Sequence, residues 1–302
     1  MVWRCGVSDR GRRQALRGAA ITTQRAGTRR TAAPATRGDA QLRARPWQAF
    51  DDRDQIARWD ALASRASEPN PFYESWFLLP SLRAFDPAGE VALLVLEHGP
   101  ALLGMLPIRR ERGYYRYPLP HLRNWCHPNC FLGMPLVAAG HERAFWQAVL
   151  DWCDAHCGTA LFLHLTQCPL EGALHTALLA ELARRARPSA TVLREERAML
   201  ASTLSPDAYL DASLSGKKRK ELRRQHRRLA ELGGLEVAGS ADSRGIQAWA
   251  EEFIALELAG WKGKAGSALG SDPRTAALFA DALAGAAQAG RLERLALRLD
   301  GQ

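Results

Sequence analysis

Apolar and polar positions alternate between helix-like and strand-like periods from residue 46 onward. Apolar residues spaced three and four apart predict helices. These cover residues 54–66, a short aromatic stretch that begins near Tyr73, residues 141–156 and residues 170–186. Short apolar runs between turn residues predict strands. They form a hairpin around His98-Gly99-Pro100 and strands in "FLGMPLV", "TALFLHL" and "SATVLREERAMLAS", the last as one long strand or a strand pair.

A second series of elements begins at Pro206. Ser205 as N-cap and Pro206 at the first helical position predict a short helix. A basic helix follows and ends at Gly233-Gly234. The pattern then predicts a strand in "LEVAGS", a helix over 243–260, a Gly-rich loop, a helix over 273–289 and an alternating strand in "RLERLALRLDG".

The order of these elements predicts an α/β fold in which mixed central sheets are flanked by helices. The second series begins as the first one does, so we expect two tandem units, residues 46–203 and 204–302. The last alternating strand ends at the turn Asp300-Gly301 with no strand after it. A strand without a partner is a poor end for a sheet, so we expect the second unit to be incomplete.

The basic charge of the chain lies in its N-terminal tail. Residues 1–45 hold eleven Arg and two Asp, which accounts for the whole net charge of +9, whereas the remainder holds thirty basic and thirty acidic residues. The tail has no apolar periodicity and lacks the apolar segment of a secretory signal, so we expect a disordered Arg-rich tail. Its composition fits an organelle transit peptide or a start codon assigned too far upstream. The body is neutral.

The most basic stretch of the body is "LSGKKRKELRRQHRRLAELGG", in which eight of the twelve residues 217–228 are Lys or Arg. One hypothesis is a nucleic-acid-binding protein that uses this helix, residues 216–232. DNA readers generally carry a basic patch on a net-basic domain, and no helix-turn-helix, RNA-recognition or zinc-finger pattern accompanies this one. Leu222, Leu229 and Leu232 form a narrow stripe suited to docking on a sheet. We therefore expect no nucleic-acid partner.

The cysteines suggest zinc at first, in "CHPNC" (Cys126, Cys130) and "CDAHC" (Cys153, Cys157). Structural zinc sites usually combine a C-x₂₋₄-C pair with a second matched pair. Here Cys153 and Cys157 lie in a predicted amphipathic helix, where cysteines one helical turn apart are an ordinary core feature. We expect core thiols and no metal. The longest uncharged stretch, "NWCHPNCFLGMPLVAAGH", is broken by Pro, Asn and Gly, so no membrane span is predicted and a cytoplasmic protein is expected.

Most common enzyme motifs are missing from the sequence, including the nucleophile elbow, the P-loop, the dinucleotide-binding glycines and H-E-x-x-H. Five stretches nevertheless occur in a recognisable order. They are "EPNPFYESWFLLPSL", "LRNWCHPNCFLGMPLV", "SGKKRKELRRQHRRLAELGGLEV", "FIALELAGWKGKAGSAL" and "AGRLERLALRLDGQ". Together they resemble the CelD-like acetyltransferases of cellulose and exopolysaccharide biosynthesis, which are built from two GNAT-like units and are distantly related to the Fem-type aminoacyl ligases. The resemblance covers residues 46–302.

The resemblance implies transfer of an acyl group from acyl-CoA, with acetyl-CoA as co-substrate, to an amine or hydroxyl of a small-molecule or glycan acceptor. Glu257 is then a candidate general base, and Trp261 and Lys262 are candidates for lining the cleft. The basic helix offers Lys217, Arg219, Arg223 and Arg224 for binding phosphate or an anionic glycan, with a solvated helix face as the alternative. Asn70 and Tyr73 belong either to a cleft or, by preference, to a turn that enters a helix.

One departure from the family concerns the donor site. GNAT enzymes hold the CoA pyrophosphate on a loop of the form R/Q-x-x-G-x-G/A at a helix N-terminus, and the chain has no match to that spacing. The first unit keeps only Gly140 of this loop. We therefore expect the first unit to be degenerate for CoA and the competent loop to lie beyond Gln302. The alternative is a non-catalytic fragment that binds a partner.

Overall fold

The computed structural model describes residues 2–4, 40–198, 200 and 202–301, and it divides the chain into two compact units, Met1–Val192 and Leu193–Gln302. The predicted Arg-rich tail falls almost wholly outside the described residues. Residues 41–46, of which all but Pro46 belong to the predicted tail, form a strand that pairs with the sheet. The division between the units falls earlier than the predicted boundary at residue 203.

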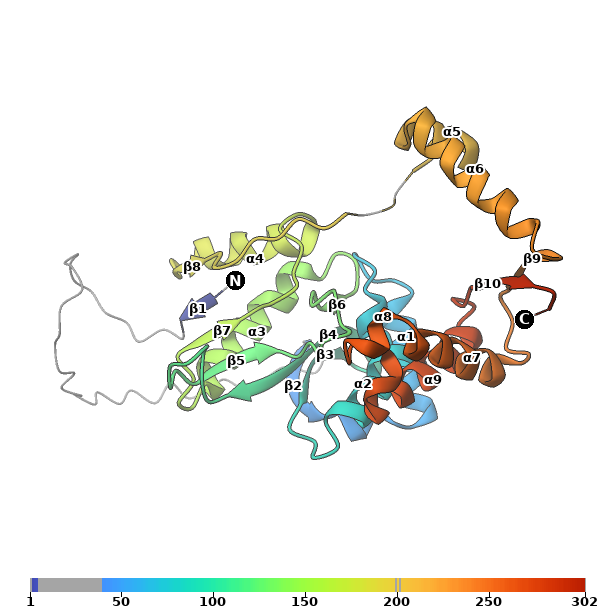
Figure 1. The fold of residues 1–302 in the computed structure, drawn as a ribbon. Helices are drawn as coiled ribbons and strands as arrows, with labels where there is room; N and C mark the ends of the chain where they lie inside the picture. Colours follow the sequence, from blue (N-terminus) through green and yellow to red (C-terminus); the bar gives the residue numbers. More distant parts are fainter. Residues whose placement is uncertain (1, 5–39, 199, 201, 302) are drawn as a thin grey trace, which may run out of the picture. The chain divides into compact units, whose positions relative to one another are not determined.

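The first unit is a mixed sheet flanked by helices (Figure 1). Its strands are β1 (Val2–Arg4), β2 (Gln41–Pro46), β3 (Ala92–His98), β4 (Ala101–Glu111), β5 (His121–Asn124), β6 (Leu136–Val137), β7 (Phe162–His164) and β8 (Ser189–Ala190). They run in the order β2-β3-β4-β5-β7-β1-β8, with β6 paired to β4. Among these pairs β5 and β7 are parallel and the others antiparallel. The helices are α1 (Arg53–Ala63), α2 (Ser75–Phe85), α3 (Glu142–His156) and α4 (Ala173–Arg184), with short 3-10 turns at Trp47–Phe50 and Pro71–Tyr73.

Both faces of this sheet are covered. Four consecutive residues of β3, residues 93–96, are buried, which requires packing on each side because neighbouring strand residues point to opposite faces. Helix α1 contacts β4, and helix α3 contacts β2 and β3. The indole N–H of Trp59 donates to the Tyr73 carbonyl at 2.9 Å, which ties α1 to the turn that enters α2. The predicted helices and the predicted hairpin around Gly99-Pro100 are confirmed.

Two strand predictions in this half of the chain are wrong in extent. "FLGMPLV" contains only the two residues of β6. In "SATVLREERAMLAS" only the two residues of β8 are a strand, and the remaining described residues are exposed and irregular. A pattern of apolar residues does not make a strand where the fold supplies no neighbouring strand.

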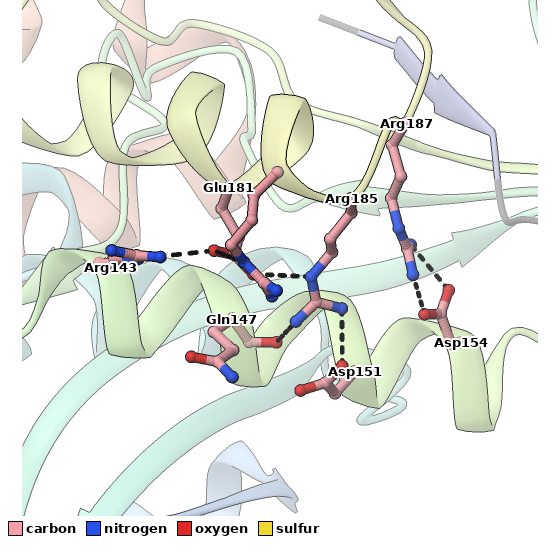
Figure 2. A network of polar contacts seen from close by, with 8 residues as sticks. Arg143, Gln147, Asp151, Asp154, Glu181, Arg185 and Arg187 are labelled. Carbon is pink, nitrogen blue, oxygen red and sulfur yellow. Dashed lines mark hydrogen bonds and ion pairs between the residues drawn. The ribbon is translucent and has the colours of Figure 1, made fainter.

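Helix α4 is held against α3 by a buried carboxylate (Figure 2). The Glu181 side chain is fully buried and accepts hydrogen bonds from Arg185 Nε at 2.7 Å and Arg184 Nε at 2.9 Å. Arg185 in turn donates to Asp151 of α3 at 2.6 Å. These guanidinium contacts hold the pKa of Glu181 at about 2, with the Arg184 hydrogen bond as the largest cause.

The second unit contains α5 (Pro206–Ser213), α6 (Gly216–Ala230), α7 (Ile246–Ala259), α8 (Trp261–Lys264) and α9 (Pro273–Gln288), with a 3-10 turn at Leu269–Ser271. Its strands β9 (Leu235–Ser240) and β10 (Arg294–Leu299) pair antiparallel. The predicted cap is confirmed, since Ser205 Oγ accepts from the Ala208 N–H. The last strand was predicted to have no partner. This is wrong for one of its two edges, because β10 pairs with β9 over its whole length.

The core of the second unit is small. Helices α7 and α9 contact each other through Trp249, Phe253 and Phe279, whose ring centroids lie 5.1–5.4 Å apart in successive pairs. Its buried hydrophobic residues are mostly alanines; they are Ala250, Ala268, Leu278, Ala282, Ala286 and Leu292. Helix α6 buries none of its residues, so the predicted leucine stripe is not packed on a sheet here.

Candidate functional site

The predicted residues Glu257, Trp261 and Lys262 lie together where α7 ends and α8 begins. One oxygen of Glu257 accepts from Lys262 Nζ at 2.6 Å, and the other accepts from the backbone N–H of Leu269 at 2.7 Å. The Glu257 side chain is only 9% exposed, whereas that of Lys262 is 44% exposed. Glu257 therefore joins the helix to both ends of the Gly-rich loop.

This geometry bears on the acid–base role of Glu257. The Lys262 hydrogen bond is the largest influence on the carboxyl and lowers its pKa; burial opposes the shift, and the Leu269 N–H adds to it. A general base works best with a pKa near the operating pH. A carboxylate with a lowered pKa and both oxygens engaged is better suited to positioning a loop than to accepting a proton.

The Gly-rich loop is built around close backbone contact with α7. A Cβ on Gly263 would lie 1.8 Å from the carbonyl oxygen of Leu258, a separation that atoms cannot adopt. Gly263 therefore lets α8 fold back directly against the end of α7. The same turn leaves Trp261 74% exposed, so its aromatic ring is presented to solvent.

The four predicted cations of α6 do not form one patch. At 100° per residue, Arg219 and Arg223 share one face of the helix, and Lys217 shares another with Arg224. On the first face Arg219 Nη1 donates to the carbonyls of Asp211 and Leu214 at 2.8 and 3.0 Å, which ties α6 to α5. On the second face Arg224 pairs with Glu221 at 2.7 Å, and this contact lowers the pKa of Glu221.

Two of the four cations are therefore engaged and two are available. Lys217 and Arg223 are exposed and have no ion-pair partner among the residues that the structure describes. Within the described part of the second unit, no hydrogen bond or ion pair joins α6 to the Glu257–Lys262 pair. The structure does not bring the two groups of predicted residues into a single contact network.

Sequence reasoning missed one buried cation in this unit. Arg294, only 6% exposed, stands at the start of β10, and its Nη2 donates to Ser240 Oγ and to the carbonyls of Asp242 and Arg244 at 2.8–2.9 Å. It fastens the loop between β9 and α7 and lines a shallow hollow with Gly239, Ser240 and Asp242. The sequence pattern placed Arg294 in an alternating strand. It could not show that the side chain is held there, because its acceptors lie in a loop some fifty residues earlier in the chain.

Asn70 and Tyr73 are structural residues of the first unit, as the preferred interpretation predicts. Asn70 is buried, caps the 3-10 turn by accepting from the Phe72 N–H, and donates to the Met134 carbonyl at 2.6 Å. The Tyr73 hydroxyl is fully buried and donates to the Trp125 carbonyl at 2.9 Å. Neither side chain is available to a ligand in this conformation.

The described residues contain neither a candidate metal site nor a helix that could span a membrane. No group of three or more His, Cys, Asp or Glu side chains there is arranged to hold a metal ion. Among the described helices, none combines the length and apolar character needed to span a bilayer.

One family model matches part of the second unit. Residues 216–302 match the family model of the acetyltransferase (GNAT) domain. The matched segment runs from α6 to β10, and it contains all seven predicted site residues, Lys217, Arg219, Arg223, Arg224, Glu257, Trp261 and Lys262. No curated protein and no solved structure gave a significant match to the chain. The class defined by the match is that of the GNAT acetyltransferases, and it is assigned to residues 216–302 alone.

Proposed function

We propose that the protein is an acyl-CoA-dependent acyltransferase of the GNAT superfamily. The observation that carries the proposal is the match of residues 216–302 to the acetyltransferase (GNAT) domain. In the proposed reaction an acceptor amine or hydroxyl attacks the thioester carbonyl, the acyl group forms an amide or ester, and CoA leaves as a thiol. Acetyl-CoA is the proposed donor, and the cytoplasm is its proposed location.

The finer parts of the proposal rest on the resemblance to CelD-like proteins. It suggests a small-molecule or glycan acceptor from polysaccharide or envelope biosynthesis, and a first unit that is itself GNAT-like. The mixed sheet flanked by helices in the first unit is compatible with such a tandem arrangement. Lys217 and Arg223 are the proposed phosphate contacts, because their charges are exposed and unpaired among the described residues.

We assign to Glu257 a positioning role. Its contacts with Lys262 and Leu269 fix the loop that presents Trp261, whose exposed ring is a candidate surface for the acceptor or the adenine of CoA. This assignment replaces a general-base role, because the Lys262 contact lowers the pKa of the carboxyl.

The test measures acetyl-CoA binding to the full chain by calorimetry, with Lys217→Gln and Arg223→Gln made separately. The two residues lie on different faces of α6, so the variant that weakens binding identifies the face used. We expect a loss of about three- to tenfold for one variant, the size of one exposed charge–phosphate contact. Arg112→Gln, an exposed charge in the first unit, is the matched control.

Release of CoA thiol in the presence of amine and hydroxyl acceptors completes the test. Turnover with any acceptor supports the proposal. If acetyl-CoA does not bind and the chain instead binds DNA with a steep salt dependence, the nucleic-acid hypothesis replaces the acyltransferase. If neither ligand binds, the chain by itself is a non-catalytic piece.

A further inference from the structure

One face of the sheet in the first unit carries a row of arginine and histidine side chains. Strand β5 lies between β4 and β7 in this sheet (Figure 1). Arg123 of β5 is the register partner of Arg109 in β4 on one side and of His164 in β7 on the other. Register partners on neighbouring strands point to the same face, so the three side chains lie side by side. The acyltransferase proposal uses none of them, and all three lie outside residues 216–302.

Arg123 is a half-buried cation without an anionic partner. Among the residues that the structure describes, its guanidinium makes no hydrogen bond or ion pair, and its Nε is buried. Arginine side chains that leave water are normally paired, because an unpaired donor loses its hydrogen bonds to water. Arg109, directly opposite on β4, adds a like charge that opposes the pairing of the two strands. The fold therefore retains a positive charge here that no protein group compensates.

His164 supplies a second nitrogen of the same kind. Its Nδ1 is buried and has no hydrogen-bond partner in the part of the chain that the structure describes. Aromatic neighbours fix the ring, since its centroid lies 5.2 Å from that of Tyr114 and 5.8 Å from that of His121. Burial is the largest cause that lowers the pKa of His164, to about 4, and nearby positive charges, Arg123 among them, add to the effect. A neutral imidazole still carries one N–H, so the ring can donate one hydrogen bond.

The charges along this face leave a positive surplus. Its strand residues are Arg109 and Glu111 of β4, His121 and Arg123 of β5, and Phe162 and His164 of β7. Glu111 is the acid of this set, and its Oε1 already accepts from Arg109 Nη2 at 2.6 Å and Nε at 3.0 Å. The carboxylate therefore offsets Arg109, and the charge of Arg123 remains.

We propose that Arg123 and His164 bind a phosphate group of a small ligand, with Arg109 beside them. A guanidinium offers parallel N–H donors to phosphate oxygens, and the imidazole adds a donor from the next strand. Neighbouring strands lie about 4.8 Å apart, so the oxygens of one phosphate can reach both side chains. Phosphate suits the row better than a carboxylate does, because a further oxygen can accept from His164 while two accept from Arg123. The bound group is the anionic partner of Arg123.

The test follows the ring signals of His164 by NMR while the full chain is titrated with inorganic phosphate at constant ionic strength. A bound anion offsets the nearby positive charges, so the pKa of His164 should rise toward its ordinary value. His98, exposed at the turn between β3 and β4, is the internal control and should not respond. Acetate offers only two oxygens and should need an on the order of tenfold higher concentration for the same effect.

Variants separate a binding role from a structural one. Arg123→Gln should weaken phosphate binding about tenfold. Its midpoint of urea unfolding should be unchanged or higher, because the substitution removes a charge that has no partner. A residue that only stabilised the sheet would show the reverse, a lower midpoint with unchanged binding.

Two matched controls accompany Arg123→Gln. Arg53→Gln changes an exposed charge at the start of α1, and Lys217→Gln changes one on the basic helix α6. Both should leave the response of His164 to phosphate as in the wild type.

The wild-type titration does not depend on how any variant folds or on acyl transfer. The proposal is overturned if the signals of His164 do not respond to phosphate, if acetate acts at the same concentrations, or if Arg123→Gln binds phosphate as tightly as the wild type.

Discussion

At the scale of single residues, Glu257 has the most specific contacts of the predicted site. Replacing it with Ala should release both Lys262 and the Leu269 N–H, with a cost of about 1–3 kcal/mol for the lost buried hydrogen bond. Glu257→Gln keeps a carbonyl acceptor for Leu269 and should cost less, because an exposed ammonium contributes little through its charge. Hydrogen exchange at Leu269 measures the difference. Equal protection in the wild type and both variants would contradict the loop-positioning role.

Glu181 provides the corresponding prediction for the first unit. The pKa of its carboxyl lies at about 2 in the folded protein, below the ordinary value of 4.5. Its stabilising contribution is therefore complete above pH 4.5 and is lost as the pH falls toward 2. Glu181→Gln should lower the free energy of unfolding at pH 7 by about 2 kcal/mol, less than the full shift implies because Arg184 is partly exposed.

The control for Glu181 lies beside it. Asp154 pairs with Arg187 near the solvent (Figure 2), and Asp154→Asn should cost under about 1 kcal/mol. Urea unfolding at pH 7 and pH 4 tests both variants. The difference in the free energy of unfolding between wild type and Glu181→Gln should be smaller at pH 4 than at pH 7. If it is the same at both, the variant acts through packing and not through charge.

At the scale of elements, two glycines of the second unit make a matched pair. A Cβ on Gly263 meets the Leu258 carbonyl oxygen at 1.8 Å, whereas a Cβ on Gly216 at the start of α6 meets nothing within 4 Å. Gly263→Ala should displace α8 and destabilise the unit by about 1–3 kcal/mol or more. Gly216→Ala should be neutral or slightly stabilising. Thermal unfolding of the two variants decides whether the close α7–α8 contact exists in solution.

The elements also show which features a sequence can reveal. The helices at residues 206–213 and 216–230 depend on local signals, namely Ser205 and Ser215 as caps and Pro206 at the first position, and both helices are observed. The predicted strand over residues 189–202 depends on distant partners, and only Ser189–Ala190 pairs. A helix cap depends on residues that are close to it in the sequence, whereas strand pairing depends on residues that are far from it in the sequence.

The same distinction explains the outcome at the candidate site. The sequence placed Glu257 and Trp261 one turn apart, and the structure brings Glu257 to Lys262. It could not show that Arg219 is occupied, because the Asp211 and Leu214 carbonyls that hold it depend on the angle between α5 and α6.

At the scale of the whole molecule, the two units differ in how much hydrophobic side-chain surface they bury. The first has a continuous core with large residues such as Trp59, Trp146 and Phe145 fully buried. The second buries mainly alanines and leaves Leu256, Leu295 and Leu297 exposed. Because hydrophobic burial is the main stabilising contribution, the second unit should unfold at a lower temperature than the first.

Scanning calorimetry of the full chain tests this difference. We expect two transitions, with the second unit unfolding at the lower temperature. Gly263→Ala should lower only the transition temperature of the second unit, and Glu181→Gln only that of the first unit. A single transition that responds to both substitutions would mean that the units unfold together and stabilise each other.

The exposed basic helix has a consequence for how it responds to its surroundings. With no buried residue and with cations along most of its length, α6 behaves as a short polyelectrolyte, in which like charges oppose the helical state. A multivalent anion that neutralises them relieves this repulsion, so the helix becomes more ordered as the anion binds. Part of the free energy of binding then goes into ordering the helix. The affinity for a phosphate-bearing ligand therefore depends on how stable the free helix is, as well as on the contacts of single side chains.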